Sequence, residues 1–172
     1  MLITPGVLLA WQISAYEALG TGSRLIEPEH LLIGLCSLEK ATSANLFVNG
    51  PPAVHAAAYE ADILYKVLTD IQLDPTLLRR SIRRRARRDV LTQPNAVMHR
   101  SELSLVIFGS AAHLARPAAM SGLHLLAALM ETPGTIVVSA LNEYGVPAAS
   151  VRHWALMANE ISGISPYDLW MC

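Results

Sequence analysis

Arginine is the residue type whose clustering in this chain most directly suggests chemistry. Seven arginines crowd ten positions, although the chain carries a formal net charge of −1, so the remaining sequence is acidic. Guanidinium groups pair with phosphates and carboxylates, so the cluster could bind nucleic acid or an acidic protein. The arginines are Arg79, Arg80, Arg83, Arg84, Arg85, Arg87 and Arg88.

The spacing of apolar residues within this cluster distinguishes these alternatives. Leu78, Ile82 and Ala86 recur every four residues, which predicts an amphipathic helix with the arginines on its solvated face. Aromatic side chains for base stacking do not interleave with the arginines. The pattern therefore favours a solvated face, or contact with an acidic protein partner, over nucleic acid.

The pair Glu29-His30 is a second feature that could hold a ligand. Pro28 opens the predicted helix, and the positive end of the helix dipole favours an acid such as Glu29 in the first turn. His30 could bond neighbouring backbone and lock the loop before the helix. The pattern favours this structural interpretation over ligand binding.

Other reactive residue types lack the spacing that catalysis or metal binding requires. His99, His113, His124 and His153 include no pair spaced as on a zinc-binding helix, and no paired cysteines accompany them. Cys36 lies in an apolar stretch without a readable His and Asn context. The sequence contains no Gly-x-x-x-x-Gly-Lys-Ser/Thr loop. We therefore expect no enzyme activity, no metal and no cofactor.

These residues lie in a sequence that repeats itself. Residues 4–35 and 101–129 each contain an apolar helical pattern followed by a His-Leu-Leu core, and the two cores lie 94 residues apart. In the preceding helix, Leu8 matches Leu103 at a separation of 95. A repeated helical unit in a short chain predicts two copies that share one core.

The periodicity predicts an all-α fold of two pseudo-symmetric four-helix repeats in a single domain, residues 1–172. Repeat one spans about 1–88, a linker spans 89–100, and repeat two spans about 101–162. Repeat one carries an insertion at about 42–62 with no partner in repeat two, which predicts an inserted or lengthened helix. We expect the shared core not to need this insertion, so its deletion should leave a folded protein.

Composition sets limits on the environment of the protein. The apolar fraction of 52% and mean hydropathy of +0.35 allow a sizeable core. No apolar stretch reaches the ~18 residues that a membrane helix needs, and the first residues lack a basic signal-peptide region. Cys36 and Cys172 are too few for a disulfide framework. We expect a cytoplasmic protein without membrane contact.

The segment from Ile26 to Leu35 resembles the Ile-x-x-Glu-His-Leu-Leu-x-Gly-Leu motif of the amino-terminal domain of Clp unfoldases, the double Clp repeat. Residues 101–129 are a weaker match, similar to the second repeat of the disaggregase branch. The resemblance covers nearly the whole chain except the insertion and the last ten residues. It implies either the front part of a longer Clp ATPase or a free-standing Clp-repeat protein.

The resemblance also implies a non-catalytic module that receives adaptors or unfolded substrates for a ring ATPase. Some members bind phosphorylated arginine through the Glu of each Glu-His pair. Glu29 matches that position in repeat one, whereas Leu123 replaces it in repeat two. The implied phosphoarginine recognition is therefore incomplete in this chain.

We predict a chaperone-associated interaction module whose partner is an adaptor protein, an unfolded substrate, or a Clp ATPase or protease ring. An apolar groove where the copies meet is the expected site, with Thr4, Leu8 and Glu29 as candidate contact residues. The alternative is a regulatory nucleic-acid-binding protein that acts through the Arg79–Arg88 helix. Steep weakening of binding by salt would distinguish that alternative. The partner's identity and the oligomeric state stay open.

Overall fold

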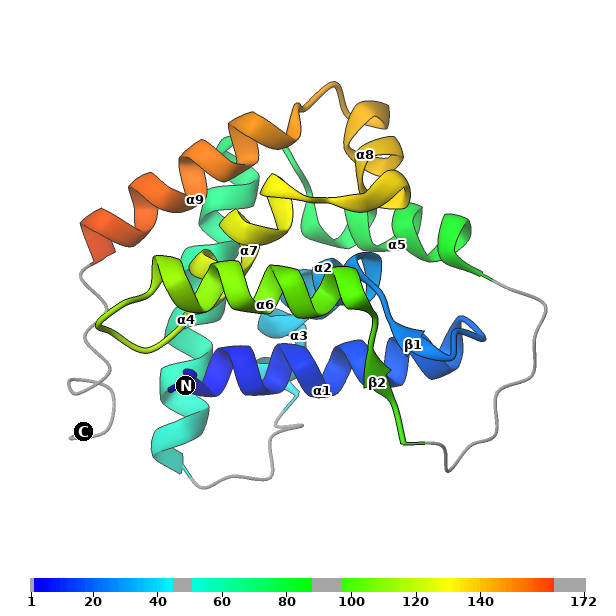
Figure 1. The fold of residues 1–172 in the computed structure, drawn as a ribbon. Helices are drawn as coiled ribbons and strands as arrows, with labels where there is room; N and C mark the ends of the chain where they lie inside the picture. Colours follow the sequence, from blue (N-terminus) through cyan, green and yellow to red (C-terminus); the bar gives the residue numbers. More distant parts are fainter. Residues whose placement is uncertain (1, 45–50, 88–96, 163–172) are drawn as a thin grey trace.

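The computed structural model describes residues 2–44, 51–87 and 97–162, and these are almost entirely helical (Figure 1). The predicted all-α fold of two pseudo-symmetric repeats is confirmed. Repeat one contains α1 (Pro5–Gly20), α2 (Pro28–Cys36), α3 (Leu38–Ser43), α4 (Pro51–Asp70) and α5 (Pro75–Ala86). Repeat two contains α6 (Glu102–Leu114), α7 (Gly122–Glu131), α8 (Gly134–Glu143) and α9 (Ala148–Ser162).

Side-chain caps begin α1, α5, α6 and α7 where the sequence places a capping residue; at α7, Ser121 Oγ accepts from His124 N at 3.5 Å. Thr4 Oγ1 accepts from Val7 N at 3.4 Å at the start of α1. Asp74 accepts from two backbone amides at the start of α5, and Ser101 Oγ accepts from Ser104 N at 3.2 Å at the start of α6. Each cap supplies an acceptor for an amide that has no partner within its own helix.

The two copies are joined by two short parallel backbone pairings. Strand β1 (Leu25–Ile26), which leads into α2, pairs with β2 (His99–Arg100), which leads into α6. Ile3, just before α1, pairs with Met120, just before α7. Each pairing therefore joins the start of a first helix in one copy to the start of a second helix in the other. The end of the predicted linker is part of β2, whereas residues 89–96 lie outside the described residues.

The two copies also exchange helix contacts and share one core. Helix α4 of repeat one packs against α9, while α8 of repeat two packs against α5. Helix α2 is buried along its whole length and α7 is buried except for its last residue, Glu131, as expected for helices that are largely apolar on all sides. No single helix in the described ranges is long and apolar enough to span a membrane. Only α7 and α8 taken together pass that test, and they are bent by 97°.

The helix caps correct the predicted alignment of the two first helices. Thr4 and Ser101 begin α1 and α6, so equivalent positions lie 97 residues apart instead of 95. Buried positions then coincide: Ala10 with Ile107, Ser14 with Ala111, and Ala18 with Ala115. The leucine pattern alone misled because the first helix of repeat two is three residues shorter: α6 has 13 residues and α1 has 16.

The predicted insertion lengthens a helix, but the expectation that the core does not need it is wrong. Helix α4 has 20 residues where α8 has 10, and the short α3 precedes it. Within the inserted stretch, Ala57 is fully buried, and Glu60 and Ala61 are only 1% and 2% exposed. The small alanines allow α4 to pack closely, so this part of the insertion belongs to the core. Residues 45–50 lie outside the described residues.

Glu60 places a buried carboxyl group between the first turns of α1 and α7. Its Oε1 accepts a hydrogen bond from Thr4 Oγ1 at 3.0 Å and another from Gly122 N. Its Oε2 lies against the first turn of α1 at Gly6. A Cβ at Gly6 would collide with this carboxyl group, and one at Gly122 would lie 3.1 Å from Oε1. Glycine at both positions therefore lets the two helix starts close around Glu60.

The environment of Glu60 makes its proton affinity depend on folding. Burial raises the pKa of its carboxyl group above the ordinary value of 4.5, against smaller lowering effects from Gly122 N, Thr4 Oγ1 and Gly6 N. The positive ends of two helix dipoles also oppose the cost of ionisation. The folded protein therefore holds this proton more tightly than the unfolded chain does.

Glu60→Gln should remove this pH dependence while keeping the Oε1 acceptor. A raised pKa in the folded state contributes stability that is complete below pH 4.5 and is lost as the pH rises through the folded-state pKa. The free energy of unfolding of the wild type, minus that of the variant, should therefore fall with rising pH. Urea unfolding from pH 4 to 8 measures it. Asp62→Asn, an exposed change on the same helix, is the control. A pH-independent difference for Glu60→Gln would contradict the assignment.

Candidate protein-interaction surface

Helices α1 and α6 run side by side in opposite directions and meet through two aromatic rings (Figure 1). Trp11 and Phe108, which are equivalent by the 97-residue separation, contact each other edge to face with ring centroids 5.1 Å apart. The Arg100 guanidinium lies 4.6 Å from the Trp11 ring centroid and 5.1 Å from that of Phe108. These contacts fix the two helices together at the junction of the copies.

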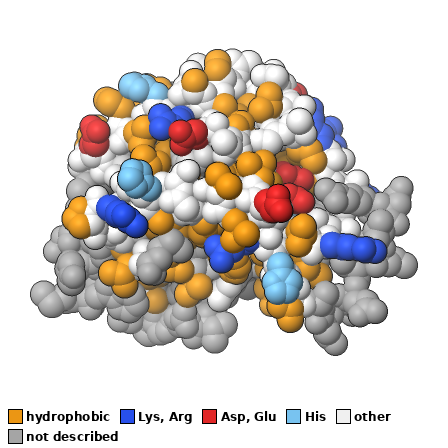
Figure 2. Space-filling view, viewed as in Figure 1, with side chains coloured by type: hydrophobic (Ala, Val, Ile, Leu, Met, Phe, Trp, Pro, Cys, Tyr) orange, Lys and Arg blue, Asp and Glu red, His pale blue; other side chains and the backbone are white. Residues whose placement is uncertain are grey.

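The facing flanks of α1 and α6 form an apolar strip that we name the junction face. It consists of Leu8, Trp11 and Ala15 on α1 and Leu105, Phe108 and Ala112 on α6. Their spacing of three, four and seven residues places each set on one helical flank. Leu105 is 50% exposed, so apolar surface remains open to solvent. Figure 2 shows orange hydrophobic side chains reaching the surface in the region of α6, between scattered charged groups.

A cavity of about 280 Å³ lies at one end of the junction face, where α6 ends and the chain enters α1. Leu2, which is 70% exposed, forms part of its wall together with Met120. Met120 N donates to Leu2 O at 3.0 Å, so the backbone pairing between the copies holds this wall. The other lining residues are Ala112, Ala115, Arg116, Pro117 and Ala118.

The structure revises two of the three residues predicted to contact a partner. Leu8 lies in the junction face and is partly exposed. Thr4 is only 3% exposed because it caps α1 and donates to Glu60. Glu29 is 7% exposed in the first turn of α2. Thr4 therefore holds the start of α1 in place, and neither Thr4 nor Glu29 presents much surface to a partner.

His30 and His124 brace equivalent helix starts. Glu27 N donates to His30 Nδ1 at 3.0 Å, which confirms the predicted bond to neighbouring backbone. Ser121 N donates to His124 Nδ1 at 3.2 Å, and His124 Nε2 lies 3.0 Å from Asn159 Nδ2 on α9. Burial lowers the pKa of His124, which favours the neutral ring, whose unprotonated Nδ1 accepts the bond from Ser121 N.

The arginine helix is less of a free basic surface than predicted. Arg79 is buried, and its Nη1 donates to Ser37 Oγ at 3.2 Å. Arg83 pairs with Glu17 on α1, and Arg84 and Arg85 pair with Glu143 on α8 at 3.3 and 2.9 Å. Arg88 lies outside the described residues. Much of the predicted cluster therefore connects α5 to its neighbours.

The described residues contain no arrangement typical of a catalytic or metal centre. Cys36 is buried, and burial raises the pKa of its thiol to about 12, so it is a poor nucleophile at neutral pH. No group of three or more His, Cys, Asp or Glu side chains in the described ranges is placed to hold a metal ion. The exposed chemistry that remains is the junction face and the unburied arginines.

Two helical repeats, each packing some of its helices against those of the other, form the fold of Clp-type amino-terminal domains. Comparison with protein-family models and with curated proteins gives no match. Among solved structures, the Hsp104 N-terminal domain from Candida albicans is similar, with a TM-score of 0.64 and 14% sequence identity. The match covers 95% of this chain and 93% of that one. The resemblance found in the sequence is therefore confirmed at the level of the fold.

Replacing Trp11 and Phe108 by alanine, singly and together, tests the junction contact. Each single change should lower the free energy of unfolding by about 2–4 kcal/mol, because removal of a large aromatic side chain leaves a cavity. The double variant should reveal a coupling of about 0.5–1.5 kcal/mol from the ring contact. Urea unfolding provides all four values. Trp11→Ala combined with Val137→Ala on the distant α8 is the control and should be additive. Additive losses for Trp11 and Phe108 would show that the rings do not interact.

Proposed function

We propose that this chain is a non-catalytic interaction module of a Clp-type chaperone system. Its junction face would bind extended apolar segments of unfolded proteins. The observation that carries the proposal is the exposed apolar surface of Leu105 on the junction face, together with the cavity at one end of that face, whose wall includes the exposed Leu2. The fold shared with the Hsp104 N-terminal domain supports a role in such a system.

The chemistry of the junction face suits an unfolded segment better than a charged ligand. Apolar groups line most of it, with the aliphatic wall formed by Leu2 and Met120 at one end. The paired rings of Trp11 and Phe108 supply a rigid base. A ring ATPase or an adaptor as a further partner, and a cytoplasmic location, belong to the same proposal.

Leu105→Ser should weaken binding to a permanently unfolded protein. Complete burial of a leucine contributes about 1.5–3 kcal/mol. Because the exposed half of Leu105 is what a ligand would cover, we expect a loss of affinity of about 5–10-fold. Fluorescence anisotropy with labelled, reduced and carboxymethylated α-lactalbumin measures the change.

Val138→Ser on α8 is the matched control, since Val138 is 39% exposed but lies outside the junction face. It should change affinity less than about twofold. Raising salt from 0.1 to 0.4 M should leave binding almost unchanged, because apolar contacts dominate. Equal effects of the two serine variants would overturn the assignment of the junction face.

The purified chain should not turn over ATP in the presence of Mg²⁺. Phosphoryl transfer needs a phosphate cradle, a metal site and a positioned nucleophile, and the sequence contains no phosphate-binding loop. A coupled phosphate-release assay on successive chromatography fractions measures this. Turnover that follows this chain through purification and changes with a point substitution in it would contradict the non-catalytic assignment.

A further inference from the structure

An open cleft of about 620 Å³ lies where the end of α1 faces the end of α5. Tyr16, Glu17 and Thr21 line it from α1 and the following turn. Arg83, Arg84 and Arg87 line it from α5 and the residue that follows that helix. The cleft is distinct from the junction face, which uses the other flank of α1.

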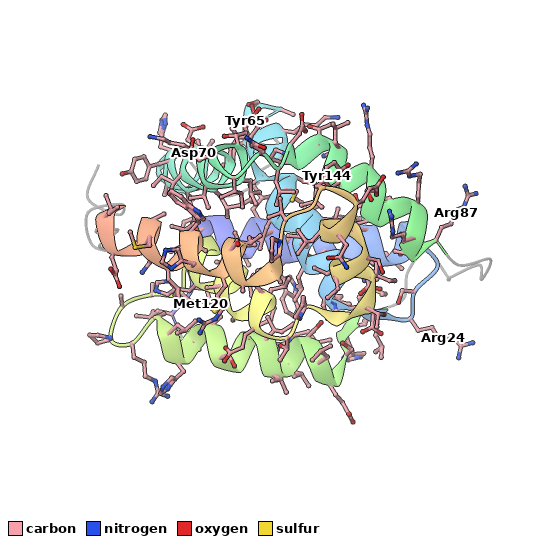
Figure 3. All side chains as sticks on the ribbon, turned by 90° about the horizontal axis from the view of Figure 1, so that it is seen from above. Arg24, Tyr65, Asp70, Arg87, Met120 and Tyr144 are labelled. Atoms are coloured by element: carbon pink, nitrogen blue, oxygen red, sulfur yellow. The ribbon has the colours of Figure 1, made fainter. Side chains whose placement is uncertain are left out.

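Positive charge exceeds negative charge at this cleft. Glu17 forms an ion pair with Arg83. Arg84 and Arg87 are therefore the cations of the cleft that remain open to a ligand. The Arg84 side chain is 70% exposed, and its contact with Glu143 at 3.3 Å also competes with Arg85 for the same carboxylate. Figure 3 shows Arg24 and Arg87 extending from the same end of the molecule, which adds to the local positive potential.

The arrangement of the two open guanidinium groups defines the chemistry they recognise. Arg84 and Arg87 lie three residues apart at the end of α5, so their side chains are neighbours. A guanidinium binds a carboxylate through two parallel hydrogen bonds. The exposed Tyr16 adds a hydroxyl donor and an apolar ring beside them. Two closely spaced carboxylates on one short peptide would satisfy both arginines.

We propose that this cleft binds an acidic peptide segment of a protein partner, with Arg84 and Arg87 as the contact residues for its carboxylates. An acidic peptide fits better than nucleic acid. Tyr16 is the one aromatic side chain among the lining residues, so the cleft lacks the succession of rings on which bases stack. The volume is also that of a site for a few side chains rather than a long polyanion.

The test compares the whole chain with variants that remove two positive charges. The probe is a fluorescein-labelled hexapeptide with four glutamates, and its glutamine counterpart is the ligand control. Arg84→Gln with Arg87→Gln should weaken binding of the acidic peptide about tenfold or more. Lys40→Gln with Lys66→Gln, which removes the same charge from two other exposed positions, should weaken it less than about twofold.

A variant with lysine at both positions distinguishes recognition through paired hydrogen bonds from general charge attraction. It is also a milder change, so it is less disruptive to folding. Arg84→Lys with Arg87→Lys keeps the charge but loses the paired hydrogen bonds, so we expect a weakening of about threefold. Unfolding curves check that each variant is folded. Equal weakening by the Lys40 and Lys66 pair, or failure of the wild type to bind the peptide, would overturn the proposal.

Two further measurements distinguish an independent site for an acidic peptide from a nucleic-acid site and from binding at the junction face. The first uses twelve-nucleotide single-stranded DNA. If this DNA binds more tightly than the peptide, through the same two arginines and with a steep salt slope, the proposal is overturned in favour of nucleic acid. Leu105→Ser should leave binding of the acidic peptide unchanged. Loss of peptide binding in that variant would show that the cleft is not an independent site.

Discussion

The contact between Glu60 and the starts of α1 and α7 is the constraint on which the arrangement of the two copies depends. Burying a carboxyl group away from water is costly, and the cost falls only if hydrogen bonds reach it. Thr4 Oγ1 and Gly122 N supply those bonds from repeat one and repeat two respectively. A shift of either copy would leave a buried acceptor or donor unpaired, so the contact fixes their relative position.

This constraint also explains why the symmetry is incomplete. Helices α4 and α8 end at Asp70 and Glu143, so Glu60 is equivalent to Pro133, directly before the start of α8. A residue outside the helix cannot place a carboxyl group as α4 does. Repeat two therefore has no counterpart of Glu60, and one carboxyl group serves both copies. The additional length of α4 is what allows repeat one to provide it.

The sequence was sufficient for the longer helices because each has a local signal, whereas the six-residue α3 and the two-residue strands β1 and β2 were not predicted. Thr4 and Pro5 mark the start of α1, and the His-Leu-Leu motifs mark the two helices that the core surrounds completely. Periodicity gave the helical repeats because burial of apolar faces follows the helical period. The alignment of α1 with α6 failed because leucines occur too often to set a register, whereas helix caps set it directly.

The candidate site was harder to predict because its residues meet only in three dimensions. Leu8 was found, but Leu105 and Phe108 of the junction face come from the other copy, and the incorrect register concealed that they are equivalent to Leu8 and Trp11. Glu60 did have a sequence signal. It lies three residues after Ala57 and four before Leu64, on an otherwise apolar helical flank, where an acid requires a specific partner. No sequence pattern identifies that partner.

Helix α1 contributes to both proposed surfaces, so their separation follows from helix geometry. Successive residues point about 100° apart around a helix. Ala15 therefore lies on the junction face, and Tyr16 lies in the cleft that Arg84 and Arg87 line. Along the axis, Leu8 and Gly20 are separated by ~18 Å, the length of five or six extended residues. The apolar and cationic surfaces are thus held at a fixed distance by one rigid helix. Because salt screens only the cationic surface strongly, the ionic-strength dependence of binding reports which surface a ligand occupies.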